Sequence, residues 1–210
     1  MSLKKSALVV FACVIGMAAP VGAQQQLYTG DGADDLWSNP ANWNGNAVPT
    51  AADVARFPTD GSTTLINSTV TAVASAFELG HPGASDPLPN SASSVINMTG
   101  GSLTALALPS NIGRGVTTDP DHLVEFNMFG GTLDVRGISI PEGFNTCDTS
   151  PIGNECVPMN TNFNVSGNSV VNTDFLRLGT GTAVTNMVVS DNATVNVLAR
   201  GLNGFTNGSI

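Results

Sequence analysis

The sequence predicts an all-β fold, a single-stranded parallel β-helix (β-solenoid) with an N-terminal aromatic cap. Three observations predict it: a short cassette recurs five times, alternating apolar runs flank the cassettes, and helical signals are scarce. One repeat cannot bury its apolar face alone, whereas stacked repeats share a continuous core. A β-sandwich is the alternative all-β architecture.

The recurring cassette has two small or turn-forming residues, a hydroxyl residue and an aliphatic residue. Its copies are Asn67-Ser68-Thr69-Val70, Gly100-Gly101-Ser102-Leu103, Gly130-Gly131-Thr132-Leu133, Gly167-Asn168-Ser169-Val170 and Asn192-Ala193-Thr194-Val195. The starts are spaced by 33, 30, 37 and 25 residues. Glycine and asparagine tolerate positive φ, so the cassette predicts a corner between two strands. Ser, Thr and Asn at equivalent corners are expected to stack as hydrogen-bonded ladders.

Strands are predicted on both sides of each corner. Runs of alternating apolar residues precede four cassettes, at 95–98, 124–128, 163–165 and 187–189. A period of two marks a strand with one buried face. Three copies then reach an aliphatic-Gly step whose glycine lies 12 or 13 residues after the cassette start, at Leu79-Gly80, Ile112-Gly113 and Leu178-Gly179. The segment from Val70 to Leu79 is also predicted as strand.

The chain begins with the features of a cleaved secretory signal peptide, residues 1–23. Lys4 and Lys5 precede an apolar segment from Ala7 to Ala19, and small residues stand before Gln24. The sequence therefore predicts a secreted or cell-surface protein. We expect a capping module at 24–60 and solenoid repeats at 61–210, incomplete at the C-terminus because the chain stops in what reads as a new coil.

The expected mature chain is acidic. It has five arginines, no lysine and sixteen carboxylates, a formal balance of −11. Such a chain repels phosphate backbones and anionic lipids, which excludes nucleic acid as a partner, and it contains no predicted membrane span. Solubility explains this charge most simply, and affinity for cations or basic surfaces is the alternative.

Two cysteines remain after the signal peptide. Cys147 and Cys156 lie in a Pro/Gly/Asn-rich insertion, 141–160, which accounts for the widest cassette spacing. In an oxidising compartment an isolated pair of this kind predicts a local disulfide. A zinc site would need further ligands, and no histidine is near in sequence.

The segment 24–60 holds both tryptophans and the only tyrosine of the chain. Burial of its aromatic side chains would form a compact cap over one end of the repeats. This segment resembles the N-terminal module of bacterial exported Gly-Gly-Thr-Leu-type repeat proteins, which are autotransporter-passenger-like and PEP-CTERM-type surface proteins. The matching residues are Trp37, Asn42, Trp43, Val48, Pro49, Asp53, Ala55 and Phe57. The resemblance implies a bacterial surface protein and does not imply a biochemical activity.

No catalytic site and no cofactor-binding site is predicted. Asp31, Asp34 and Asp35 are weak calcium candidates, because oxygen ligands separated by glycine suit calcium, and a solvated turn before Trp37 is the alternative. His81 and His122, the only histidines, have no convergent partners in sequence.

The sequence therefore favours an exported structural or adhesive β-solenoid, not an enzyme. Its expected partners are surface polysaccharide or other matrix proteins. A carbohydrate-active β-helix enzyme, either a polysaccharide lyase or a hydrolase, is the alternative, and a passenger fragment of a longer chain is a third possibility. A groove with two or more acids and an arginine would favour the enzyme.

Overall fold

The computed structural model describes residues 24–58, 61–80, 93–113, 116–117, 123–142, 157–158, 160–180, 184–204 and 208–209. Its strands are β1 (Gln25–Leu27), β2 (Val54–Phe57), β3 (Thr63–Ile66), β4 (Thr71–Val73), β5 (Ala76–Leu79), β6 (Ser94–Ala105), β7 (Ser110–Ile112), β8 (Val116–Thr117), β9 (Leu123–Val135), β10 (Ile138–Glu142), β11 (Val157–Pro158), β12 (Asn160–Val165), β13 (Val170–Thr180), β14 (Thr185–Val189), β15 (Thr194–Gly204) and β16 (Gly208–Ser209). Two short 3₁₀ turns, η1 (Pro40–Asn42) and η2 (Asn44–Asn46), precede β2. No α-helix occurs in these ranges, which confirms the predicted all-β class.

The strands pair mainly in parallel and form three stacks. The first stack consists of β3, the first part of β6, the first part of β9, β12, β14 and β16. The second consists of β4, the remainder of β6 and of β9, and the first parts of β13 and β15. The third consists of β1, β2, β5, β7, β10 and the last parts of β13 and β15. β8 and β11 form a separate antiparallel pair.

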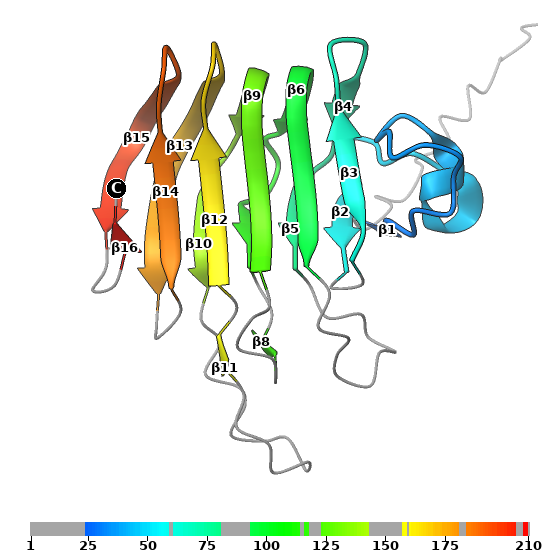
Figure 1. Ribbon diagram of the computed structural model, residues 1–210, viewed down its shortest axis with the longest axis horizontal. Helices are drawn as coiled ribbons and strands as arrows, with labels where there is room; N and C mark the ends of the chain where they lie inside the picture. Colours follow the sequence, from blue (N-terminus) through cyan, green and yellow to red (C-terminus); the bar gives the residue numbers. More distant parts are fainter. Residues whose placement is uncertain are drawn as a thin grey trace, which may run out of the picture.

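The stacks lie in layers. Figure 1 shows β3, β6, β9, β12 and β14 side by side in front, with β2, β5, β10 and β13 behind them. This predominantly parallel arrangement is consistent with the predicted β-solenoid. It disfavours the β-sandwich alternative, because such sandwiches are built from antiparallel sheets.

The Gly-Gly cassettes form corners between the first and second stacks, as predicted. Gly101 and Gly131 have φ of 67° and 91°, a region that residues with a Cβ rarely adopt. A Cβ on Gly131 would lie 2.7 Å from the carbonyl oxygen of Gly100 in the adjacent strand. Glycine is therefore needed here both for its backbone angle and for the close approach of neighbouring corners.

One hydrophobic core runs through the stacks. Phe77, Phe126 and Phe163 are fully buried, and their ring centroids follow one another at 5.5 and 5.6 Å. Two of the three aliphatic-Gly steps lie side by side, because Leu79 pairs with Ile112. Leu178 of the third step pairs with Ile140, which proline follows in place of glycine. The segment from Val70 to Leu79 contains β4 and β5, so its predicted extended structure is confirmed.

The register of two cassettes differs from the prediction. Leu133 pairs with Val171, one residue beyond the expected Val170, and Leu103 pairs with Ala72, two residues beyond the expected Val70. Val195, in the last cassette, pairs with Val171 and so aligns with Leu133 as expected. The first corner is longer because Asn67 caps a turn there, its Oδ1 accepting from Thr69 N at 3.0 Å.

The segment that precedes β2 lies at one end of the strand array (Figure 1). Its aromatic rings pack together in the hydrophobic core. Trp37, Trp43 and Phe57 are each 1% exposed, which confirms their predicted burial. Trp43 Nε1 donates to Trp37 O at 2.8 Å, and the two rings lie 5.0 Å apart. Tyr28 packs edge-on against Trp43 at 5.2 Å. The array therefore begins with a dense aromatic cluster.

The polar residues of this segment hold its turns. Asn42 is fully buried, accepting from Gly32 N at 2.7 Å and donating to Leu36 O at 2.9 Å. Asp53 Oδ2 accepts from Thr50 N at 2.9 Å and from Thr50 Oγ1 at 2.6 Å. Asn42 and Asp53 thus serve the local structure.

Candidate functional site

Side-chain amides form two ladders on the outward face of the first stack. In one ladder, Asn164 Nδ2 donates to Asn127 Oδ1 at 2.8 Å, and Asn127 Nδ2 donates to Asn97 Oδ1 at 3.2 Å. In the other, Asn186 Nδ2 donates to Asn162 Oδ1, and Asn162 Nδ2 donates to Glu125 Oε1, both at 3.1 Å. The rungs are paired residues of adjacent strands, so the ladders follow the stacking direction.

A third ladder lies on the second stack. Asn196 Nδ2 donates to Asn172 Oδ1 at 2.9 Å, and Asn172 Nδ2 donates to Asp134 Oδ1 at 2.6 Å. The corner amides add only one weak bond, from Asn192 Nδ2 to Asn168 Oδ1 at 3.4 Å. The sequence predicted ladders at the corners. Most of the ladder bonds instead join residues within strands, which strand pairing holds in register.

A signal for the first ladder is present in the sequence. Asn97, Asn127 and Asn164 each stand between two apolar residues in the alternating run that precedes a cassette. These apolar neighbours are buried, which turns the asparagines outward. An amide that gives one N–H and one lone pair to its ladder keeps a second N–H and a second lone pair for another partner.

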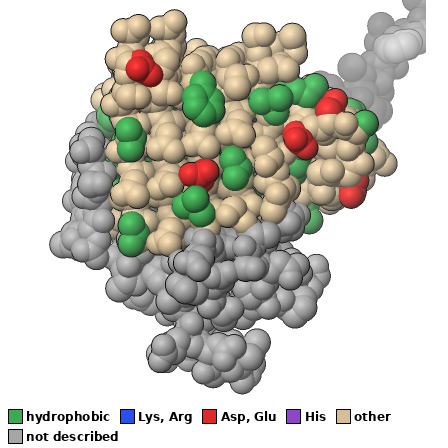
Figure 2. Space-filling view, in the orientation of Figure 1, with side chains coloured by type: hydrophobic (Ala, Val, Ile, Leu, Met, Phe, Trp, Pro, Cys, Tyr) green, Lys and Arg blue, Asp and Glu red, His purple; other side chains and the backbone are tan. Residues whose placement is uncertain are grey.

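The face that bears the first two ladders is polar and almost uncharged. Figure 2 shows its described part as mainly uncharged polar side chains and backbone, with separate hydrophobic and acidic side chains and no visible Lys or Arg. Adjacent strands lie about 4.8 Å apart, so this face presents rows of amides at a regular interval.

A groove of about 310 Å³ lies on the second stack, beside the third ladder. Asp134, Asn172 and Asp174 line it together with Leu106 and Leu198. The residues come from β9, β13, β15 and the turn after β6. The fold therefore brings two carboxylates from different coils into one groove.

No arginine lines this groove in the described part of the chain. The exposed side chain of Arg136 lies along the surface, with Nη1 donating to Ala107 O at 2.7 Å. Arg177 lies with its guanidinium carbon 5.9 Å from the centre of the Phe175 ring. Among the described side chains, the lining of this groove includes two acids and no basic group.

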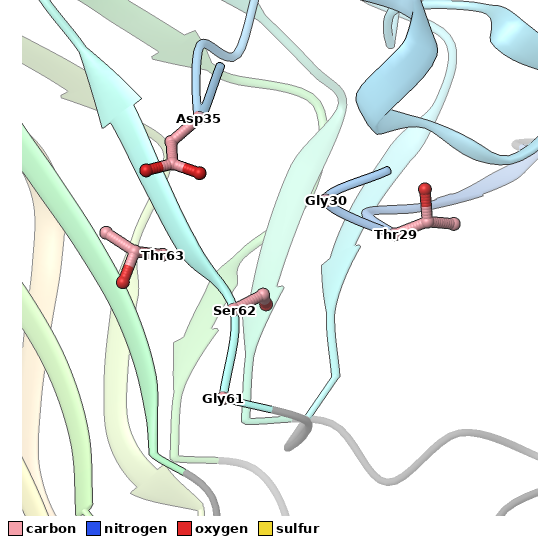
Figure 3. Close-up of a pocket in the computed structure, with 6 residues that line it drawn as sticks. All are labelled: Thr29, Gly30, Asp35, Gly61, Ser62 and Thr63. Atoms are coloured by element: carbon pink, nitrogen blue, oxygen red, sulfur yellow. The ribbon is translucent and has the colours of Figure 1, made fainter. Parts of the chain in front are cut away.

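A second cavity of about 310 Å³ lies where the aromatic segment meets β3. Its lining includes Asp35, Ser62 and Thr63 (Figure 3). Tyr28 is fully buried next to it, and its hydroxyl lies 3.1 Å from Asp35 O and 3.2 Å from Thr63 O, so its single hydrogen can be donated to either carbonyl. This cavity offers one carboxylate and several hydroxyl groups.

The three calcium candidates lie in different local environments. Asp34 Oδ1 accepts from Leu36 N at 3.2 Å and from Asn39 Nδ2 at 2.9 Å, so it holds a turn. Asp35 lines the cavity of Figure 3, whereas exposed Asp31 does not. Within the described ranges, no group of three His, Cys, Asp or Glu side chains is placed to hold a metal ion.

The third stack carries a partly buried ion pair. Arg56 Nε lies 2.7 Å from Glu78 Oε2, with the two side chains 17% and 9% exposed. Arg56 Nη1 also donates to Gln25 Oε1 at 2.6 Å. Burial lowers the pKa of the Arg56 guanidinium, because removal from water disfavours its charged form. The ion pair links β2 to β5, and the hydrogen bond to Gln25 links β2 to β1.

Several predicted features lie outside the described residues: the signal peptide at 1–23, both histidines, and the cysteine pair Cys147 and Cys156. The disulfide therefore stays a prediction. None of the helices in the described ranges has the length and apolar character needed to cross a membrane. Comparisons with protein-family models, curated proteins and solved structures find no match to this chain.

Proposed function

We propose that this chain is an exported β-solenoid of the bacterial cell surface or matrix, with a structural or adhesive role that includes contact with carbohydrate. The amide ladders carry this proposal. They repeat one polar group along the stack, and sugar hydroxyls can donate to an amide oxygen and accept from an amide N–H. A surface built in this way suits a long, repetitive ligand such as a polysaccharide.

The parallel stacking supports a structural role as well. Each coil is joined to the next by strand pairing, and in the middle of the array also by amide bonds. Repeat stacks of this type are extended and hold their side chains at fixed intervals. The resemblance of the Trp37–Phe57 segment to modules of bacterial surface proteins agrees with this role.

Asn164 offers a direct test of the carbohydrate contact. In a glycan array with the chain from Gln24 onward, wild-type protein should bind at least one surface polysaccharide. Asn164→Thr should weaken this binding several-fold, because it removes a ladder amide and keeps a small, strand-compatible side chain. Val188→Thr is the matched control, since Val188 pairs with Asn164 on the adjacent strand, is 51% exposed and lies outside the ladder.

Two results would contradict the carbohydrate contact. One is that the wild-type protein binds no polysaccharide on the array, and the other is that Asn164→Thr and Val188→Thr lose binding to the same extent. Thermal melting of each variant, followed by circular dichroism, checks that the fold is retained. Export is tested separately: expression with residues 1–23 should yield an extracellular or surface protein that begins at Gln24.

A carbohydrate-active enzyme is the second candidate, favoured by the presence of Asp134 and Asp174 in one groove. Glycosidases use two carboxylates, one as an acid and the other as a nucleophile or base. Incubation with polysaccharides that the protein binds, followed by assays for new reducing ends and unsaturated sugars, tests this activity. Product that disappears in Asp134→Asn would establish the enzyme and overturn a purely adhesive role.

A further inference from the structure

The cavity where the aromatic segment meets β3 has two walls that the fold holds together (Figure 3). Leu65 N donates to Asp35 O at 2.7 Å, which joins the aromatic segment to β3. The hydroxyl of buried Tyr28 lies within hydrogen-bonding distance of the carbonyl oxygens of Asp35 and Thr63, one from each wall. The exposed lining between these walls is almost wholly polar. The cavity is therefore a fixed polar site of about 310 Å³.

The side chain of Asp35 supplies an acceptor that the fold itself does not use. It is exposed, and it makes no hydrogen bond or ion pair with another residue in the described structure. A carboxylate accepts through both oxygens and donates through neither, so it suits two adjacent hydroxyl groups of one sugar ring. The described lining also contains the hydroxyl of Thr63 and includes no lysine or arginine.

The cavity lies in line with the second amide ladder. Strand pairing places Thr63 opposite Val95, which lies opposite Glu125. Glu125 pairs with Asn162, and Asn162 pairs with Asn186. These side chains form one row on the outward face of the first stack. The row crosses four strand intervals, and at about 4.8 Å each it is about 19 Å long.

We propose that this cavity binds one unit of a neutral polysaccharide through two adjacent hydroxyl groups, with the rest of the polysaccharide lying along the second ladder. The two hydroxyls would donate to Asp35, and Thr63 would bind a third. Later units would lie over Asn162 and Asn186. An acidic sugar would be opposed by the carboxylates of Asp35 and Glu125. This inference rests on the proposed carbohydrate contact, and it names the class of sugar and the direction of the chain.

Calorimetric titration of the chain from Gln24 onward tests the class of sugar. The neutral probes are 1,4-linked hexamers of glucose, mannose and xylose, which all have free hydroxyls at the adjacent 2 and 3 positions of each unit. At least one of them should bind. The 1,4-linked hexamer of galacturonic acid has the same adjacent hydroxyls and one carboxylate per unit, and it should bind at least about tenfold more weakly.

Substitutions assign the binding to the cavity and to the row. Asp35→Ala should weaken the neutral hexamer about tenfold, as expected for lost hydrogen bonds to a charged group. Asp31→Ala is the matched control, because exposed Asp31 lies outside the cavity. Asn186→Thr should weaken the hexamer several-fold and leave the disaccharide of the same sugar unaffected, since a disaccharide in the cavity does not reach Asn186. Thermal melting of each variant confirms that it is folded.

The outcomes separate this inference from the proposed function. Tighter binding of the galacturonic acid hexamer, or equal effects of Asp35→Ala and Asp31→Ala, would overturn the cavity site. An equal effect of Asn186→Thr on the hexamer and the disaccharide would overturn the direction along the ladder. If a glycan binds and Asn164→Thr weakens that binding, whereas Asp35→Ala does not, the carbohydrate contact stands and the cavity site fails. If no glycan binds at all, both proposals fail.

Discussion

Asn172 Nδ2 donates a hydrogen bond to Asp134 Oδ1 at 2.6 Å, although 38 residues separate them in the chain. The pair joins β9 to β13 and orders one carboxylate of the groove. Asn172 in turn accepts from Asn196 on β15. A single amide therefore serves both the stacking of three strands and the geometry of the candidate site.

Removal of one ladder amide should destabilise the stack. Asn127 makes two ladder bonds, so Asn127→Ala should lower the free energy of unfolding by about 1–3 kcal/mol. Asn192→Ala is the control, because exposed Asn192 makes one ladder bond of 3.4 Å and should lose little. Urea denaturation followed by circular dichroism measures both. Equal midpoints for the two variants would contradict a stabilising role of the ladder.

The aromatic cluster should account for a large part of the stability at the N-terminal end. Trp43→Ala should cost about 3–5 kcal/mol, since it removes a buried ring and leaves a cavity. Trp43→Phe should cost less, because it keeps most of the ring contacts and loses the bond to Trp37 O. Thermal melting of the three proteins tests the order. A melting temperature of Trp43→Ala equal to that of wild type would rule the cluster out as a stabilising cap.

Replacement of two glycines with positive φ should distinguish the cost of backbone strain from the cost of steric crowding. Gly45→Ala should cost about 1–2 kcal/mol, because φ is +73° and no atom lies within 4 Å of the new Cβ. Gly131→Ala should cost clearly more, since its Cβ would approach the Gly100 carbonyl to 2.7 Å. Chemical denaturation of both variants gives the difference. A smaller effect at Gly131 than at Gly45 would show that adjacent corners are not packed as described.

The partly buried ion pair between Arg56 and Glu78 should be sensitive to loss of its carboxylate. Glu78→Gln leaves the partly buried Arg56 guanidinium without its counter-charge and should cost about 1–3 kcal/mol, between the values for exposed and fully buried pairs. Glu125→Gln makes the same charge change where no ion pair exists within the described structure, and its new amide oxygen can still accept from Asn162. Denaturant midpoints should therefore fall much further for Glu78→Gln. Similar losses in the two variants would argue against the pair.

The lowered pKa of Arg56 sets the expected pH dependence of this effect. A lowered folded-state pKa means that burial of the charged guanidinium opposes folding wherever the group is protonated. Both the folded and unfolded chains are protonated at neutral pH, so the cost is constant there and falls only in strongly alkaline solution. The difference between Glu78→Gln and wild type should therefore not change across neutral pH.

The predicted disulfide has a direct chemical test. Mass spectrometry of the non-reduced, exported protein should show a peptide pair joined through Cys147 and Cys156. Two alkylatable thiols in that protein would exclude the bond. Reduction should have little effect on the melting of the strand array if the bond only closes the local insertion.

Much of the fold could be predicted from local patterns. Alternation at period two identified the strands, and Gly101 and Gly131 identified corners, because few other residues adopt positive φ without strain. The buried aromatic residues Trp37 and Trp43 were also predicted from composition and turn chemistry alone. These features depend on interactions between residues a few positions apart in the chain, so they can be recognised from the sequence alone.

Only the tertiary structure decided which residues lie side by side across coils. Val170 and Val171 are both aliphatic, so the sequence could not choose between them as the partner of Leu133, and strand pairing selects Val171. The meeting of Asp134 with Asp174 beside Leu198 likewise depends on hydrogen bonds between segments 24 to 38 residues apart. The sequence determined by itself where the chain turns and which faces it buries. Inter-strand pairing, a long-range interaction, determined the register and therefore the composition of the ladders and the groove.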